Sequence, residues 1–152
     1  MNEEENLRTP NRGRSEETKQ QELMFKFSLF EQHIRQLQQQ IQAVEQAIVD
    51  MDSLNFGLDE LVGKENKEVF APIGRGILAK TKLISEELLV DVGGKNFVKK
   101  SIPETKEMIS NQIQRLEDAK KELEQNLEQV GKELENVMSE DKTRDIFKDN
   151  NA

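Results

Sequence analysis

Few residues of this 152-residue chain could do covalent chemistry, and none of them has the partners that such chemistry needs. His33 is the only histidine, and no Ser/His/Asp set or metal-ligand spacing surrounds it. The chain has no cysteine, which excludes disulfides, thiolate metal sites and a cysteine nucleophile. The run Gly74–Ala79 matches a dinucleotide fingerprint, but that motif requires a helix directly after its glycines, and a strand-like segment follows here. We therefore predict that the chain is not an enzyme and uses no cofactor or metal.

The residues that could bind a partner are apolar and lie near the start of the first predicted helix. Large apolar residues there occupy nearly every side of two turns, whereas from 31 to 50 the positions off the core stripe are almost all polar. Exposed apolar groups mark binding surfaces, and methionine adapts its shape to different partners. The alternative is that these residues pack on another subunit or on a tail. Together with the apolar residues that end the second predicted helix, the predicted binding surface is Met24, Phe25, Phe27, Leu29, Phe30, Val137, Met138, Ile146 and Phe147.

The first helix is predicted from apolar residues that recur at alternating steps of four and three. This spacing is typical of a coiled coil in which every core position is filled. Gly63 is the expected end of the helix. The core positions are Leu23, Phe27, Phe30, Ile34, Leu37, Ile41, Val44, Ile48 and Met51.

Beyond Met51 the repeat changes. The next apolar step is three residues, to Leu54, and Asn55 stands where the strict repeat would place an apolar residue. We expect the register to shift at this point. The stripe then continues with Leu58 and with Leu61 or Val62.

Residues 66–101 form short runs rich in β-branched residues and separated by glycines, which predicts two β-hairpins. The first joins Glu68–Pro72 to Ile77–Ile84, and the second joins Leu88–Val92 to Lys95–Lys100. Gly93 and Gly94 suit a tight turn with positive φ, and as the two loop residues they would place Val90 opposite Phe97. Such small sheets leave open edges, so we expect them to pair with strands of other subunits. The predicted assembly residues are Val69, Phe70, Pro72, Ile73, Gly74, Gly76, Leu88, Val90, Val92, Gly93 and Phe97.

The second helix begins at Ser101, where Glu104 three residues later completes a capping box. Lys120 occupies one core position, which can help to fix the register. The apolar positions of its stripe are Ile109, Ile113, Leu116, Leu123, Leu127, Val130, Leu134 and Val137.

These elements predict an α+β fold in which a long antiparallel two-helix coiled coil carries two β-hairpins inserted between the helices. The predicted segments are a disordered polar tail (1–17), helix 1 (18–63), the hairpins (64–100), helix 2 (101–139) and a flexible tail (140–152). The hairpins should lie at one end of the coiled coil and both termini at the other.

Composition limits the possible partners. The net charge of -8 argues against a general nucleic-acid binder, which needs a basic face for phosphates. The first residues are acidic and polar rather than those of a signal peptide, and no apolar run approaches the ~20 residues of a membrane helix. We therefore expect the protein to be cytoplasmic, without nucleic-acid or membrane partners.

The arrangement resembles prefoldin, and it does so from about Leu23 to Val137. The most specific part is the segment Val69–Gly76, with its Pro-x-Gly-x-Gly turn, followed by a strand that ends in Val92-Gly93. In having two hairpins rather than one, the chain resembles the alpha class of prefoldin subunits. The resemblance implies a hexamer of two alpha and four beta subunits that holds unfolded clients without ATP and passes them to a group II chaperonin. It also favours an archaeal source.

Two other functions are alternatives to that of a chaperone. A structural adaptor would bind a specific partner helix through its coiled coil, but it would not need two hairpins between its helices. A nucleotide-exchange cofactor for another chaperone would carry its β part after the helices. The position of the hairpins therefore favours the chaperone.

Overall fold

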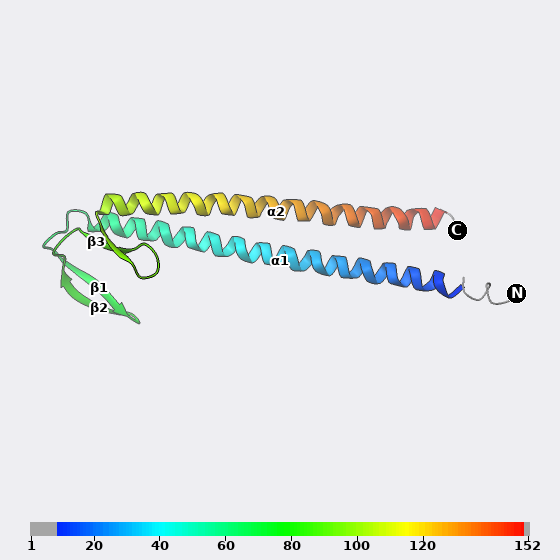
Figure 1. Ribbon diagram of the computed structural model, residues 1–152, viewed down its shortest axis with the longest axis horizontal. Helices are drawn as coiled ribbons and strands as arrows, with labels where there is room; N and C mark the ends of the chain where they lie inside the picture. The colour runs from blue at the N-terminus through cyan, green and yellow to red at the C-terminus, as the bar shows by residue number, and fades with distance from the viewer. Residues whose placement is uncertain (1–8, 151–152) are drawn as a thin grey trace. The chain divides into compact units, whose positions relative to one another are not determined.

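The computed structural model describes residues 9–150 of the chain and the side chains of residues 16–140. The predicted α+β fold is confirmed, because in chain order two antiparallel hairpins follow one long helix and precede the other (Figure 1). At their outer ends both helices extend past the predicted bounds of 18 and 139, since α1 begins at Thr9 and α2 ends at Asn150. In chain order the elements are α1 (Thr9–Leu61), β1 (Glu68–Gly74), β2 (Ile77–Lys82), β3 (Leu88–Asp91), β4 (Phe97–Lys100) and α2 (Ile102–Asn150).

The chain divides into two compact units. The terminal unit comprises Met1–Gln42 and Lys121–Ala152, and the hairpin unit comprises Ala43–Lys120. In the terminal unit, Leu37 of α1 and Val130 of α2 are only 5% and 7% exposed. An isolated helix cannot cover its own side chains to this extent, so the two helices pack together there. The core of the hairpin unit consists of Leu58, Ile102 and Ile109, with Met51, Leu61, Leu88 and Ile113 packed against it.

Two ion pairs show that α1 and α2 run antiparallel within the hairpin unit. Lys120 Nζ lies 3.2 Å from Glu45 Oε1, and Lys106 pairs with Asp59. Between the two pairs each helix advances by 14 residues (45 to 59 and 106 to 120), which is two heptads. The helices therefore keep one register over this length, as a coiled coil requires. Lys120 is half-buried at its predicted core position, with a carboxylate beside it.

The predicted register shift after Met51 is wrong. Asn55 is half-buried and stays on the stripe, whereas Leu54, the predicted core residue, is exposed. A continuous helix keeps its periodicity, so the position one heptad after Ile48 faces the partner helix whatever residue fills it. Asn55 Oδ1 is buried there and has no hydrogen-bond partner among the described residues.

Replacing Asn55 with leucine is expected to raise the free energy of unfolding by about 1–3 kcal/mol, because it removes an unsatisfied buried acceptor and adds apolar contact. Thermal unfolding of the full chain, followed by circular dichroism, measures this change. Ser53→Leu is the matched control, since Ser53 is exposed on the same helix and should give little gain. A lower melting temperature for Asn55→Leu would contradict the expectation that the buried Asn55 side chain lowers the free energy of unfolding.

Local signals set the helix ends at the hairpins. Gly63 has φ 76 and follows the end of α1 at Leu61, as predicted. At the start of α2, Ser101 Oγ accepts a hydrogen bond from the Glu104 N–H at 3.2 Å, which is the first half of the predicted capping box. Thr105 Oγ1 also donates to the Ser101 carbonyl at 2.8 Å. These signals define where the hairpin segment begins and ends along the chain.

The two hairpins form separate two-stranded sheets, β1 with β2 and β3 with β4. In the first, Ala71 pairs with Ala79 and Gly74 with Ile77, so Ile73 is an extra residue, a β-bulge. Arg75 and Gly76, with φ 50 and 78, are the loop residues of a type I′ turn.

The predicted pairing of Val90 with Phe97 is wrong. Val90 lies opposite Val98, and Phe97 lies opposite Asp91. The loop residues are Gly94 and Lys95, with φ 59 and 63, rather than Gly93 and Gly94. The Asn96 N–H donates to the Gly93 carbonyl across this turn, and the extra residue in the strand is Val92. A one-residue change in the loop puts Val90 and Phe97 on opposite faces of the sheet.

Candidate functional site

The apolar start of α1 divides into a packed stripe and an exposed surface. Leu23, Phe27 and Phe30 are half-buried on the coiled-coil stripe. Met24 and Phe25 are 72% and 66% exposed, and Leu29 is exposed as well. Phe25 and Leu29 are four residues apart, so their side chains are neighbours on one helix face. Phe27 and Phe30 are thus engaged in helix packing, and the residues free to bind a partner are Met24, Phe25 and Leu29.

The end of α2 adds to this surface within the same unit. Met138 is exposed, while Val137 is half-buried on the stripe. The predicted contributors Ile146 and Phe147 lie outside the residues whose side chains the structure describes. We call Met24, Phe25, Leu29 and Met138 the helix-end patch. Its chemistry is apolar and adaptable, which suits loose contacts with apolar segments rather than recognition of one shape.

The hairpins carry the second candidate surface. Large apolar side chains are exposed on both of them, and each sheet has two strands and therefore two open edges. Of the predicted assembly residues, Val69, Leu88 and Val90 are half-buried. The exposed apolar residues of this segment are Phe70, Ile73, Ile77, Leu78, Ile84, Leu89, Val92, Phe97 and Val98.

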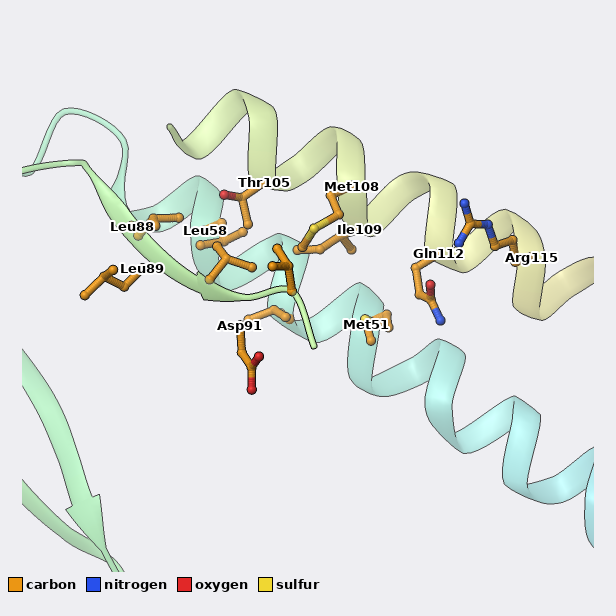
Figure 2. Close-up of a pocket in the computed structure, with 13 residues that line it drawn as sticks. Met51, Leu58, Leu88, Leu89, Asp91, Thr105, Met108, Ile109, Gln112 and Arg115 are labelled. Atoms are coloured by element: carbon orange, nitrogen blue, oxygen red, sulfur yellow. The ribbon is translucent and has the colours of Figure 1, made fainter. Parts of the chain in front are cut away.

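A groove of about 630 Å³, which no sequence pattern predicted, opens beside β3 in the hairpin unit (Figure 2). Most of its wall is apolar and comes from three parts of the chain: Met51 and Leu58 in α1, the segment Leu88–Val92 at β3, and Met108 in α2. Thr105, Gln112 and Arg115 add polar groups from α2. A groove between separate elements depends on how they pack, which no local pattern encodes.

Two exposed residues of α1 were also missed as candidate surface residues. Val49 and Phe56 lie one heptad apart, off the coiled-coil stripe, and both are exposed in the hairpin unit. The seven-residue spacing was the signal that could have found them. They supply exposed apolar area on α1 that is separate from the helix-end patch.

Among the described residues, His33 and the Gly74–Ala79 run lack the surroundings that catalysis or nucleotide binding would need. His33 is exposed on α1. Gly74–Ala79 spans the first hairpin turn and part of β2, so the helix that a dinucleotide fingerprint requires is absent. Across the described residues, no group of three or more His, Asp or Glu side chains could hold a metal ion. None of the helix segments described is long and apolar enough to cross a membrane.

Comparison with known proteins gives a consistent result. A family model described as "Prefoldin subunit" matches residues 30–144. The chain is 34% identical to the "Prefoldin subunit alpha" of Methanobrevibacter smithii over 110 residues, which are 72% of this chain and 75% of that protein. It is 25% identical to the protein of the same name from Methanosphaera stadtmanae over 91 residues, 60% of this chain and 66% of that one.

The fold also matches a solved structure. A chain in the cryo-EM structure of filamentous PFD from Methanocaldococcus jannaschii superposes with a TM-score of 0.67 at 21% identity. The match covers 73% of this chain and 93% of that chain. At this identity the likeness concerns the fold alone.

Proposed function

We propose a function from one premise: this chain belongs to the prefoldin family of chaperones and is of the archaeal alpha type. The proposed activity is that of a holdase, which captures unfolded or nascent polypeptides and keeps them from aggregating without using ATP. The observation that carries this proposal is the helix-end patch, because its residues are large, apolar and exposed although they belong to a stably packed helix pair.

Several properties of the patch support client binding. Each large side chain that a client covers contributes about 1.5–3 kcal/mol before ordering costs. A single patch therefore binds weakly, which suits a chaperone that must release its client. Several subunits acting on one client would add avidity without tight individual contacts.

Assembly with other subunits is the second part of the proposal. The partners are prefoldin beta subunits, in a hexamer of two alpha and four beta chains that is joined through the hairpins. The open strand edges and the exposed apolar faces of both hairpins support it, since an isolated two-stranded sheet is only marginally stable in water. We further propose that the complex works in the cytoplasm and delivers its clients to a group II chaperonin.

An aggregation assay tests the holdase activity. The complex of this chain with a beta-type subunit should suppress aggregation of a chemically denatured client equally well with and without ATP, because the sequence and the described residues offer no phosphate-binding loop. Light scattering at several ratios of complex to client measures the effect. Failure to suppress aggregation at any ratio, or a requirement for ATP in the purified complex, would contradict the proposed function.

A further inference from the structure

The two hairpins match each other residue by residue when the second is shifted by 19 positions. The pairs Val69–Thr81 and Ala71–Ala79 in the first hairpin correspond to Leu88–Lys100 and Val90–Val98 in the second (69 to 88, 71 to 90). The agreement extends to the turns. In both hairpins an extra residue, Ile73 or Val92, precedes a glycine with positive φ and two loop residues in the left-handed region.

The backbone angles agree at these matching positions. Gly74, Arg75 and Gly76 have φ 145, 50 and 78, and the residues 19 positions later have φ 130, 59 and 63. Positive φ is uncommon for residues other than glycine, and each hairpin has one such residue among the three, Arg75 or Lys95. The same bulge and turn in both hairpins is therefore a specific likeness.

The exposed faces match as well. Phe70 and Leu78 are diagonal neighbours on one face of the first sheet, and Leu89 and Phe97 occupy the same two places in the second, so that Phe and Leu are exchanged. Phe70 and Leu89 are both 67% exposed, and Leu78 and Phe97 are 59% and 60% exposed. The Phe and Leu side chains are thus exposed to the same degree on both faces, and the faces differ where Pro72 of the first corresponds to Asp91 of the second.

An ion pair recurs beside each face. Glu68 Oε2 lies 3.1 Å from Lys80 Nζ, and Glu87 Oε1 lies 3.8 Å from Lys99 Nζ, which are corresponding positions. All four side chains are exposed, so these pairs contribute little to stability. On the second face Asp91 stands in the place of Pro72 and adds one more acid. Each face therefore presents two large apolar side chains beside an acid and a base, and the paired acid and base add no net charge to that face. A hairpin face of the same composition is complementary to it.

We propose that the two hairpins are two copies of one docking module, and that each copy packs its Phe/Leu face against a hairpin of another prefoldin subunit in the same way. The proposal rests on the assembly part of the proposed function and extends it, since it makes the two binding surfaces of one chain equivalent. It also identifies the four side chains that form them: Phe70, Leu78, Leu89 and Phe97.

Matched substitutions test the equivalence. Phe70→Ser and Leu89→Ser change corresponding exposed positions, and each should weaken assembly with a beta-type subunit by a similar factor, within about threefold of the other. The double exchanges Phe70→Leu/Leu78→Phe and Leu89→Phe/Phe97→Leu give each face the Phe/Leu arrangement of the other, and should assemble as the parent does. Native mass spectrometry of a dilution series gives the affinities, and circular dichroism checks that each variant keeps its helices.

The outcomes separate this proposal from the one on which it rests. A difference above about tenfold between Phe70→Ser and Leu89→Ser, or loss of assembly in either double exchange, would overturn the equivalence while assembly through the hairpins still holds. If both serine variants assemble as tightly as the parent, the Phe/Leu faces are not the docking surfaces and this proposal fails. The assembly part of the proposed function fails only if Val90→Asp, which acts on the other face, is also without effect.

Discussion

Replacing Met24, Phe25 and Leu29 with serine is expected to weaken client binding at least tenfold while the helices and the oligomer remain intact. These side chains are exposed and lie off the coiled-coil stripe, so their loss removes apolar area from the surface and not from the core. The loss of three contacts of about 1.5–3 kcal/mol each far exceeds the 1.4 kcal/mol that corresponds to a factor of ten. Suppression of client aggregation measures the effect, and the thermal melt of the variant should stay within a few degrees of the parent.

A second variant distinguishes this patch from exposed apolar surface in general. Val49 and Phe56 are also exposed on α1, but they belong to the hairpin unit. Val49→Ser/Phe56→Ser should leave client protection unchanged. Equal protection by the triple variant and the parent would refute the helix-end patch as the client site, and dissociation of the triple variant would show that these residues are structural contacts.

Replacing Val90 with aspartate is expected to abolish the large oligomer while most of the helix content remains. Val90 is half-buried, faces Val98 across the second sheet and lines the groove beside α1 and α2. A carboxylate there stands opposite an apolar side chain and must lose part of its hydration, which disrupts the packing of β3 and hence the surface through which subunits join. Light scattering gives the mass, and circular dichroism gives the helix content.

The control for this variant carries the same charge change in the same hairpin. Asn96 is exposed and ends the turn. Its described hydrogen bonds are made by its backbone: its N–H donates to the Gly93 carbonyl, and its carbonyl accepts from the Val92 N–H. Asn96→Asp should therefore leave the mass of the oligomer unchanged. An unchanged mass for Val90→Asp would show that β3 does not contribute to assembly, and a reduced mass for Asn96→Asp would attribute the effect to charge alone.

The sequence by itself determined the elements whose signals are local or periodic. Alternating steps of four and three along the chain defined both helical stripes, because side chains at that spacing share one face of a helix. Gly63 marked the end of α1 and Ser101 the start of α2, since each supplies the backbone geometry or the hydrogen bond that a helix end needs. The composition and spacing of residues 66–101 likewise predicted two hairpins between the helices.

Tertiary structure decided the features that depend on how these elements meet. Asn55 remains on the stripe because the helix continues without interruption and the partner helix covers that position, although its side chain argues against burial. The register of the second hairpin follows from the bulge at Val92, whose hydrogen bond to Asn96 no pair of turn residues reveals. Packing also divided the apolar start of α1 into the half-buried Phe27 side and the exposed Phe25 side. Exposure is a property of the surroundings of a side chain, and only the packed chain supplies those surroundings.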